Sequence, residues 1–271
     1  MKSKRLIVIL CALAFLTVLI VVNSTIFTLQ KVSINWLTST IQLENLNNYD
    51  LTNSVSKGGS IFLVNKQKII NKLEKDNSYL RVVSIETVFP NKLVIHSAER
   101  ESLFAVRMPN AEGSTDYKYA IVDELGKVLD FTSSAVFAQN DGTKPIRVVF
   151  EDIPIDINHF IKGENIKVDY VKDLLCTLGK TLREASYTPR TCKGVFNKFT
   201  VSSQGEFSKI EMGTRNGMTI RLMSAERYTT DKFLLGLGAY NQFHQDGVSV
   251  GIIEVREQPE YGIVARYIDG E

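Results

Sequence analysis

The side chains that most often carry out chemistry are few and scattered in this chain. The three histidines, His96, His159 and His244, fall in a predicted strand, a loop and the end of a predicted helix. No two of them have the spacing of metal ligands. Serine, aspartate and histidine are all present, but no Gly-x-Ser-x-Gly turn accompanies them. We therefore expect no catalytic residue and no metal site.

Two acidic pairs, Glu99 with Glu101 and Glu151 with Asp152, are the remaining candidates for acid–base chemistry. A glycosidase depends on a defined separation between two carboxyl groups, and the sequence gives no such separation. The glycine pair at 58–59 is not followed by the Lys and Ser or Thr of a phosphate-binding loop. These patterns favour a protein that is not an enzyme and uses no cofactor. An anchored cell-wall hydrolase is kept as an alternative.

The charge balance changes once the N-terminal tip is set aside. Lys2, Lys4 and Arg5 are three of the 32 Lys and Arg, which leaves 29 of them against 30 Asp and Glu in the rest of the chain. A surface that is nearly neutral lacks the basic stripe that neutralises phosphates. Nucleic acid is therefore excluded as a partner, and no small-molecule substrate is indicated.

An uncharged apolar run from Leu6 to Val22 follows these three basic residues. Its length is close to the lower limit for crossing a bilayer, and positive charge stays on the cytoplasmic side. A cleaved signal peptide is the alternative, but Ile20 and Val22 are bulky where a cleavage site needs small residues. We expect a cytoplasmic tail over residues 1–5 and a single transmembrane helix over 6–26, with the bulk of the chain outside the cell.

The residues after this run are long enough for two modest domains. We predict a first domain over 27–100 and a second over 101–271, and the charges around Arg100 mark the junction, because consecutive charges resist burial.

Cys176 is expected on the surface of a helix and Cys192 in a loop. A disulfide between them and two free thiols both remain open.

The stretch 61–100 predicts one helix and two strands. Ile69, Ile70 and Leu73 share one face of a helix. Strands are indicated at 83–89 and 93–95, separated by a turn at Pro90. A strand over 27–36 and a weak helical stripe over 42–54 precede this stretch, so the predicted order is strand, helix, helix, strand, strand.

The second domain is predicted to be mainly antiparallel β structure with flanking helices, because most connections are short. Strands are expected at 103–107, 119–122, 128–131, 198–201, 209–213, 218–223, 250–256 and 262–267. Helices are expected at 167–186 and 230–243, the second capped by Thr230. Asn216 and Gly217 form a strong hairpin signal. The fold class is α+β.

These elements resemble those of the FtsQ/DivIB family of bacterial cell-division proteins. The likeness is most specific over Ile85 to Glu99, where a strand, the turn at Pro90 and a second strand fall in the family's order. The run 119–123 with Gly126 resembles the hairpin that opens the family's β domain. Near the C-terminus, 253–256 resembles its penultimate strand, with Glu254 where an aspartate is common.

The resemblance implies a transmembrane helix, a POTRA domain and a β domain. It also implies a scaffold at the division septum of the plasma membrane, which binds bitopic partners of the FtsL and FtsB/DivIC kind and helps to control septal peptidoglycan synthesis. A C-terminal edge strand leaves backbone groups available for a partner strand. We expect Tyr267 to be an aromatic anchor there, and the alternative is an ordinary edge strand blunted by Arg266. The predicted partner-binding residues are Ile253, Glu254, Val255, Arg256, Ile263, Val264, Ala265, Arg266 and Tyr267. A POTRA-bearing secretion or assembly factor is the main alternative.

Overall fold

The structure is a computed structural model that describes residues 2–37, 51–52, 55–109, 117–138, 141–153, 155–204 and 207–269. It divides into two compact units, Met1–Arg100 and Glu101–Glu271. The finer division of the first unit into a tail, a membrane helix and a POTRA-like domain stays a prediction.

The first unit begins with helix α1 (Lys2–Thr25). Apolar side chains are exposed along it, including Leu10, Phe15 and Ile20, and none of them belongs to a hydrophobic core. Among the described residues, no helix combines the length and the hydropathy of a membrane span. The transmembrane segment over 6–26 therefore remains a prediction.

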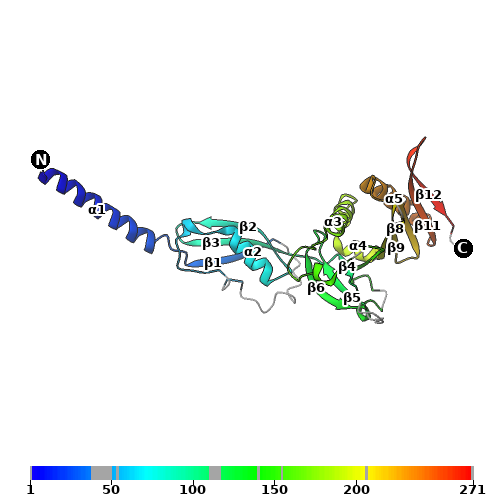
Figure 1. Cartoon of the computed structure of the whole chain (residues 1–271), viewed down its shortest axis with the longest axis horizontal. Coiled ribbons are helices and arrows are strands. Elements are labelled where there is room, and N and C mark those ends of the chain that lie inside the picture. Colours follow the sequence, from blue (N-terminus) through cyan, green and yellow to red (C-terminus); the bar gives the residue numbers. More distant parts are fainter. Residues whose placement is uncertain are drawn as a thin grey trace. The chain divides into compact units, whose positions relative to one another are not determined.

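In the described residues of the first unit, three strands form a sheet in the order β1-β3-β2 (Figure 1). Strand β1 is parallel to β3, and β2 is antiparallel to β3. The predicted order of elements is found where the chain is described, but most of the helical stripe over 42–54 lies outside the described residues. The elements are β1 (Lys31–Trp36), the 3-10 helix η2 (Ile61–Leu63), α2 (Lys66–Asp76), β2 (Leu80–Val88) and β3 (Lys92–Glu99).

Helix α2 forms where the sequence predicts it and packs its apolar face onto this sheet. The Asn65 side chain caps it by accepting a hydrogen bond from the Lys68 backbone N–H at 2.9 Å. Leu73 is buried, and Ile69 and Ile70 pack around it. Strand β3 alternates buried and half-buried residues, with Leu93 at the centre of the core.

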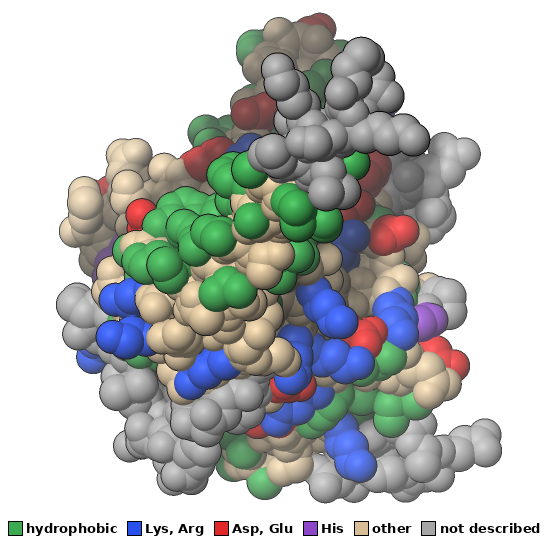
Figure 2. Space-filling view, turned by 90° about the vertical axis from the view of Figure 1, so that its left-hand side faces the viewer, with side chains coloured by type: hydrophobic (Ala, Val, Ile, Leu, Met, Phe, Trp, Pro, Cys, Tyr) green, Lys and Arg blue, Asp and Glu red, His purple; other side chains and the backbone are tan. Residues whose placement is uncertain are grey.

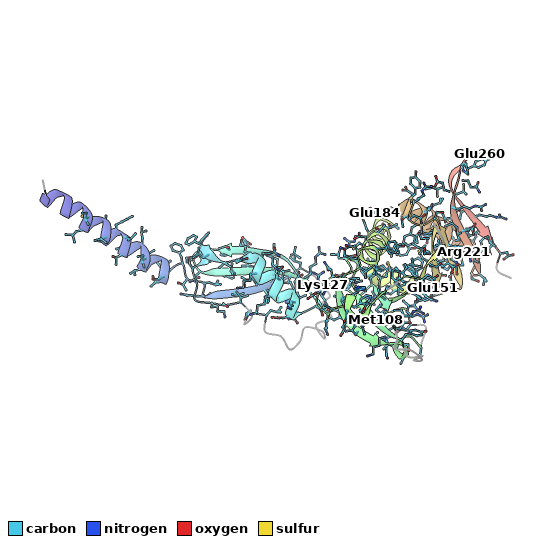
Figure 3. All side chains as sticks on the ribbon, in the orientation of Figure 1. Met108, Lys127, Glu151, Glu184, Arg221 and Glu260 are labelled. Carbon is cyan, nitrogen blue, oxygen red and sulfur yellow. The ribbon has the colours of Figure 1, made fainter. Side chains whose placement is uncertain are left out.

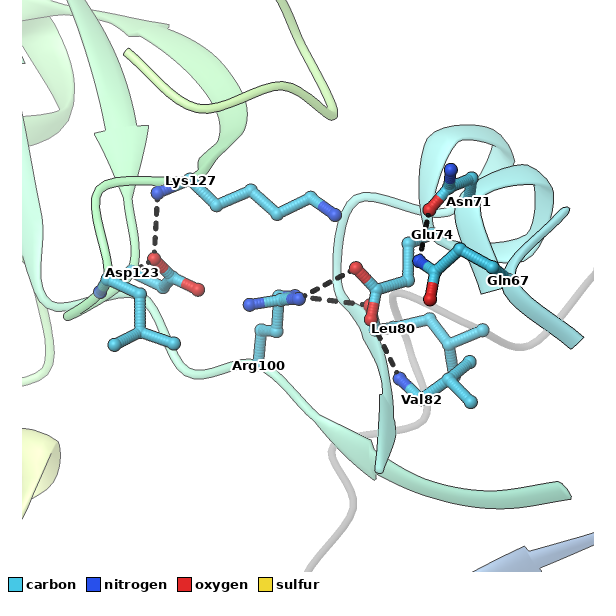
Figure 4. Close-up of polar contacts among 9 residues, drawn as sticks. Gln67, Asn71, Glu74, Leu80, Val82, Arg100, Asp123 and Lys127 are labelled. Carbon is cyan, nitrogen blue, oxygen red and sulfur yellow. Dashed lines mark hydrogen bonds and ion pairs between the residues drawn. The ribbon is translucent and has the colours of Figure 1, made fainter. Parts of the chain in front are cut away.

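A buried ion pair ties the end of this unit to α2 (Figure 4). The Arg100 guanidinium donates to the Glu74 carboxylate at 2.9 Å and to the Leu80 carbonyl at 3.1 Å. Glu74 also accepts a hydrogen bond from the Val82 backbone N–H at 2.9 Å. The side chains of Arg100 and Glu74 are only 9% and 17% exposed. The charge cluster that predicts a junction therefore includes one charge that is structural.

The described residues of the second unit contain a nine-stranded sheet in the order β12-β11-β10-β9-β8-β7-β4-β5-β6. The strands are β4 (Phe104–Arg107), β5 (Lys118–Val122), β6 (Val128–Ser133), β7 (Ile146–Glu151), β8 (Phe196–Gln204), β9 (Phe207–Thr214), β10 (Met218–Met223), β11 (Gly251–Gln258) and β12 (Gly262–Ile268). The helices are α3 (Asp169–Glu184), α4 (Pro189–Val195) and α5 (Thr229–Gln245), with 3-10 turns η3 (Ser134–Phe137) and η4 (Ile157–His159).

The sheet is mostly antiparallel, as predicted, but three of its pairings are parallel. These are β4 with β7, β7 with β8, and β10 with β11. A parallel pair needs a crossover of a dozen or more residues. Helices α3 and α4 make the crossover from β7 to β8, and α5 makes the one from β10 to β11. The sequence analysis expected mostly short connections and therefore did not recognise that these helices are crossovers between parallel strands. It also did not predict strand β7.

Helices α3 and α5 contact each other, and α5 packs on β10, β11 and β12 (Figure 1). The core of the unit lies beneath them and includes Phe196, Phe199 and Phe233.

The start of α5 differs from the prediction. This helix begins at Thr229 after Tyr228, so Thr230 lies inside its first turn and does not cap it.

The cysteines also depart from expectation. Cys192 lies buried on α4, not in a loop, because Thr188 and Thr191 form a capping box that starts a helix there, with Pro189 at its first position. Cys176 is half-buried, and both thiols are free in the structure. Burial raises the pKa of the Cys192 thiol to about 12.

Candidate interaction site

Strand β12 lies at one edge of the nine-stranded sheet and, among the described residues, pairs only with β11. An edge strand presents backbone N–H and C=O groups that a further strand can pair with. Natural edges are commonly blocked by proline or by several charged side chains. Within Gly262–Ile268 there is no proline, and Arg266 is the only charged residue. This edge is therefore chemically open to strand addition.

The β11–β12 hairpin fixes the register of the edge. Ile253 is opposite Tyr267, and Glu254 is opposite Arg266. The turn between the strands contains Glu260, which marks the tip of the hairpin in Figure 3. Gly262 has a φ of 70°, a left-handed conformation that glycine adopts at little cost. All nine predicted partner-binding residues lie in this hairpin.

One face of the hairpin is turned toward α5. Ile253 and Val255 are fully buried in the core, so their side chains are not available to a partner. Ile263 and Tyr267 pack against the same core from β12. Ile253 and Val255 therefore support the edge from beneath, and Ile263 and Tyr267 are half-buried beside them.

Tyr267 is held more tightly than an exposed anchor would be. Its ring packs on Phe243 with 4.8 Å between centroids, and its hydroxyl donates to the Val250 carbonyl at 2.7 Å. The ring also fills the space beside Gly251, where an added Cβ would approach it to 2.6 Å. Burial and the nearby Asp269 carboxylate raise the pKa of Tyr267. Replacing Tyr267 would therefore disturb the hairpin itself, so it is unsuitable as a test of partner contact.

The opposite face of the hairpin carries charged side chains that continue across the sheet. Glu211 on β9 pairs with Arg221 on β10 at 2.8 Å. The Glu254 carboxylate on β11 lies 3.8 Å from both Arg221 and Arg256. Arg221 is labelled on this part of the sheet in Figure 3. Opposite charges therefore alternate from strand to strand toward the edge.

This charged row ends at Arg266, which is exposed on β12 opposite Glu254. Arg256 lies beside it on β11, and Val264 is the register partner of Arg256. Arginine offers several N–H donors in a planar fork that suits a carboxylate. The face next to the open edge is therefore basic and can accept an acidic side chain from an added strand.

Helix α5 is fixed over this end of the sheet by a buried lysine. Lys232 Nζ donates to the carbonyls of Met223 at 3.0 Å and Ser224 at 2.8 Å. These carbonyls close the end of β10, so the ammonium group joins the first turn of the helix to the strand. Burial lowers the pKa of Lys232. No sequence pattern signals this role, since a lysine in a helix ordinarily faces solvent.

Of the nine predicted residues, the structure brings Glu254, Arg256, Val264 and Arg266 onto the charged face, and Ala265 is exposed on β12. The prediction missed Glu211 and Arg221, which extend the same face onto β9 and β10. Their signal was the alternation of charged and apolar residues in these two strands. Whether these residues bind a partner stays a prediction.

The histidines make structural contacts. His96 on β3 lies 3.5 Å from Glu86, and His159 completes a capping box with Asp156. His244 stacks on Tyr240 at the end of α5, with 5.8 Å between the rings. Within the part of the chain that the structure describes, no group of His, Cys, Asp and Glu side chains could hold a metal ion.

Comparison with known proteins identifies one domain. Residues 39–100 match the family model described as POTRA domain, FtsQ-type. The chain therefore carries an FtsQ-type POTRA domain, consistent with the resemblance to the FtsQ/DivIB family. POTRA domains are non-catalytic and mediate protein–protein interaction, which indicates a scaffold related to cell division. No curated protein matches the chain.

Proposed function

We propose that the chain is a membrane-anchored scaffold of the bacterial division complex. It binds bitopic partners of the FtsL and FtsB/DivIC kind outside the cytoplasm and helps to control septal peptidoglycan synthesis. The FtsQ-type POTRA domain supports the division role. The exposed apolar side chains along α1, after Lys2, Lys4 and Arg5, support anchoring in the plasma membrane with the N-terminus in the cytoplasm.

The observation that carries the proposal is the open edge of β12. A partner segment adds there as a further strand, and the backbone hydrogen bonds supply most of its affinity. Arg266 and Arg256 stand on the face that the added strand continues. A strand with a carboxylate beside Arg266 is preferred, because a basic surface steers and orients an acidic partner.

Paired proline substitutions test this edge. Along an edge strand, alternate residues direct their N–H groups toward the neighbouring strand and away from it. Of Val264→Pro and Ala265→Pro, one removes a bond to β11 and lowers the melting temperature. The other removes a backbone N–H from the open edge. That variant should retain its melting temperature but no longer capture the partner's extracytoplasmic segment. Full capture by a proline variant that retains its melting temperature would overturn the proposal.

Arg266→Glu adds an independent measurement, because it reverses the charge on the open face and leaves the backbone intact. It should weaken capture by about tenfold, the size of one lost charge contact at an interface.

Depletion of the protein in cells distinguishes the division scaffold from the alternative role. Long unseptated cells support the division scaffold, and an export defect with normal septa supports a secretion or assembly factor instead.

A further inference from the structure

Three phenylalanine rings form a cluster at one end of the first unit, in which Phe62 and Phe89 are exposed and Phe27 is half-buried. The ring centroids of Phe27 and Phe62 are 5.1 Å apart, and those of Phe62 and Phe89 are 5.4 Å apart. Phe62 is 59% exposed, Phe89 is 58% exposed and the adjacent Leu63 is 85% exposed. Ile26 and Val88 are exposed beside them. We call these six residues, Ile26, Phe27, Phe62, Leu63, Val88 and Phe89, the aromatic tip.

The aromatic tip stands on a hydrogen-bonded base. The Ile61 N–H donates to the Phe27 carbonyl at 2.8 Å, and Thr28 forms a β-bridge with Ser60. The Lys31 N–H donates to the Asn91 carbonyl at 3.2 Å, which joins β1 to the turn between β2 and β3. The backbone therefore holds the rings in place at the surface. Exposed apolar groups that the fold fixes in this way are typical of binding surfaces.

Chain connectivity indicates what covers the aromatic tip. Phe27 follows the end of α1 at Thr25 by two residues, and two residues span at most about 7 Å. The Ile26 N–H still donates to the Val22 carbonyl at 2.9 Å, so the helical turn continues to the edge of the tip. Where α1 spans the bilayer, its end lies at the membrane surface, and Phe and Leu side chains can bury there at the boundary between headgroups and acyl chains.

Charge around the aromatic tip agrees with a lipid surface. The three segments that build it, 26–31, 57–64 and 88–92, contain Lys31, Lys57 and Lys92 and no Asp or Glu. Lys31 and Lys92 are register partners on adjacent strands. Figure 2 faces the side from which α1 extends, and the exposed apolar side chains of α1 belong to the hydrophobic surface on this side. Apolar groups bordered by lysines suit an anionic bilayer interface.

We infer that the aromatic tip inserts into the bilayer interface beside α1, with Lys31, Lys57 and Lys92 on anionic phospholipid headgroups. The inference rests on the proposed membrane anchor. Its consequence is that the domain is fixed against the bilayer at two places, through α1 and through the rings. A domain attached only by residues 26–30 would instead pivot about them.

The chain contains one tryptophan, Trp36, which makes a direct test possible. Trp36 lies at the other end of β1 from Lys31, about 16 Å along the strand. The full chain is reconstituted into liposomes of phosphatidylglycerol and phosphatidylcholine that carry a nitroxide-labelled lipid with a shallow label. The probe variant is Phe89→Trp in a Trp36→Phe background, and the unaltered chain is its matched control.

Fluorescence of the probe variant should be strongly quenched by the labelled lipid, and emission from Trp36 in the unaltered chain should not. The substitutions Phe27→Ser and Phe62→Ser, made together in the probe variant, should abolish the quenching, because each removes a ring from the interface. Co-flotation with the liposomes reports α1 separately. A probe variant that floats but remains unquenched overturns the aromatic tip and leaves the proposed anchor standing.

One further outcome would overturn the assignment to lipid, and another would overturn the contact with anionic headgroups. If the introduced tryptophan is shielded from solvent only when a bitopic partner is reconstituted with the chain, the tip is a contact for a partner helix. If quenching is equal in pure phosphatidylcholine, or unchanged by Lys31→Glu with Lys92→Glu, the headgroup contact is wrong. For a chain that does not float, the probe variant is measured without residues 2–25 after adding anionic vesicles. Absence of quenching there overturns the aromatic tip as well.

Discussion

At the scale of single residues, the buried pair of Glu74 and Arg100 is the clearest determinant of the first unit. Breaking a buried ion pair by removing one partner leaves a charge that neither water nor protein satisfies. Glu74 also holds the Val82 N–H, so its loss costs a second contact. The pair therefore connects α2, β2 and the end of the unit through one carboxylate.

We predict that Glu74→Ala or Arg100→Ala lowers the free energy of unfolding by about 2–4 kcal/mol. The double variant should lose less than the sum of the two, because the second substitution removes the stranded charge. Urea denaturation measures both quantities. The control is Glu86→Ala, which removes a partner of His96 that is exposed to solvent and should cost less than about 1 kcal/mol. Additive losses would show that the two side chains are not coupled.

The Cys192 thiol gives a prediction that depends on pH. Burial raises its pKa from the ordinary value of 9.0 to about 12 in the folded protein. The neutral thiol is therefore favoured by folding, and this stability is fully present below about pH 9. It is lost as the pH rises from 9 toward 12, because only the unfolded state ionises readily there.

Alkylation followed by peptide mass spectrometry checks this difference. At pH 8 the native protein should react at Cys176 well before Cys192, because the thiolate is the reactive form and Cys176 is less buried. Denaturant should remove the difference between the two. Equal rates in the folded protein would show that Cys192 is accessible, contrary to its position on α4.

At the scale of elements, two glycines in α5 occupy opposite environments. A Cβ at Gly236 would lie 2.7 Å from Ile220 Cγ2 and 3.3 Å from Val255 Cγ2, so the helix can approach the sheet only without a side chain there. A Cβ at Gly238 would meet nothing within 4 Å. Both glycines sit in a helix and lower its propensity equally.

We therefore predict opposite effects for the same substitution two residues apart. Gly238→Ala should raise the free energy of unfolding by about 0.5–1 kcal/mol. Gly236→Ala should lower it, because the clash with the stiff Ile220 side chain costs about 1–3 kcal/mol and exceeds the gain in propensity. Denaturation of the two variants in parallel measures both changes in the free energy of unfolding. Stabilisation by both would mean that α5 does not rest on β10 as described.

Sequence patterns predicted most elements but not their partners. Alternation and turn residues located β9, β10 and the hairpin at Gly217, because these signals are local. Pairing between β7 and β8 or β10 and β11 was missed, since it depends on which helix crosses the sheet. Only Gly236 of the two glycines in α5 approaches the sheet, and no local pattern distinguishes it from Gly238.

At the candidate site, too, local sequence signals predicted the strand but not the contacts of its side chains. The sequence placed an edge strand near the C-terminus, and β12 is at an edge. It also assigned Tyr267 to the contact surface, because the resemblance implies an aromatic residue there and a large amphipathic ring suits a binding anchor. Phe243 and the Val250 carbonyl, which hold that ring, are distant in sequence and left no local signal. Tertiary contacts of this kind decide which side chains remain available to a partner.

At the scale of the whole molecule, the described residues form two hydrophobic cores that share no residue. One surrounds Leu73, Leu93 and Ile95, and the other surrounds Phe199 and Phe233. Where the side chains of α1 are described, at 9–22 and 24–25, none belongs to either core. Each core lies within one compact unit, so each unit has its own source of cooperativity.

We therefore predict that the chain without residues 2–25 unfolds in two calorimetric transitions. Glu74→Ala should shift only the transition of the first unit, because the carboxylate lies beside the core of that unit. Gly236→Ala should shift only the other, through the packing of α5 on β10. If a single transition appears and both variants displace it together, the two cores unfold as one cooperative body. Independent shifts would mean that the domain that carries the aromatic tip and the sheet that ends at β12 can be altered separately, so that each proposed contact can be tested without disturbing the other.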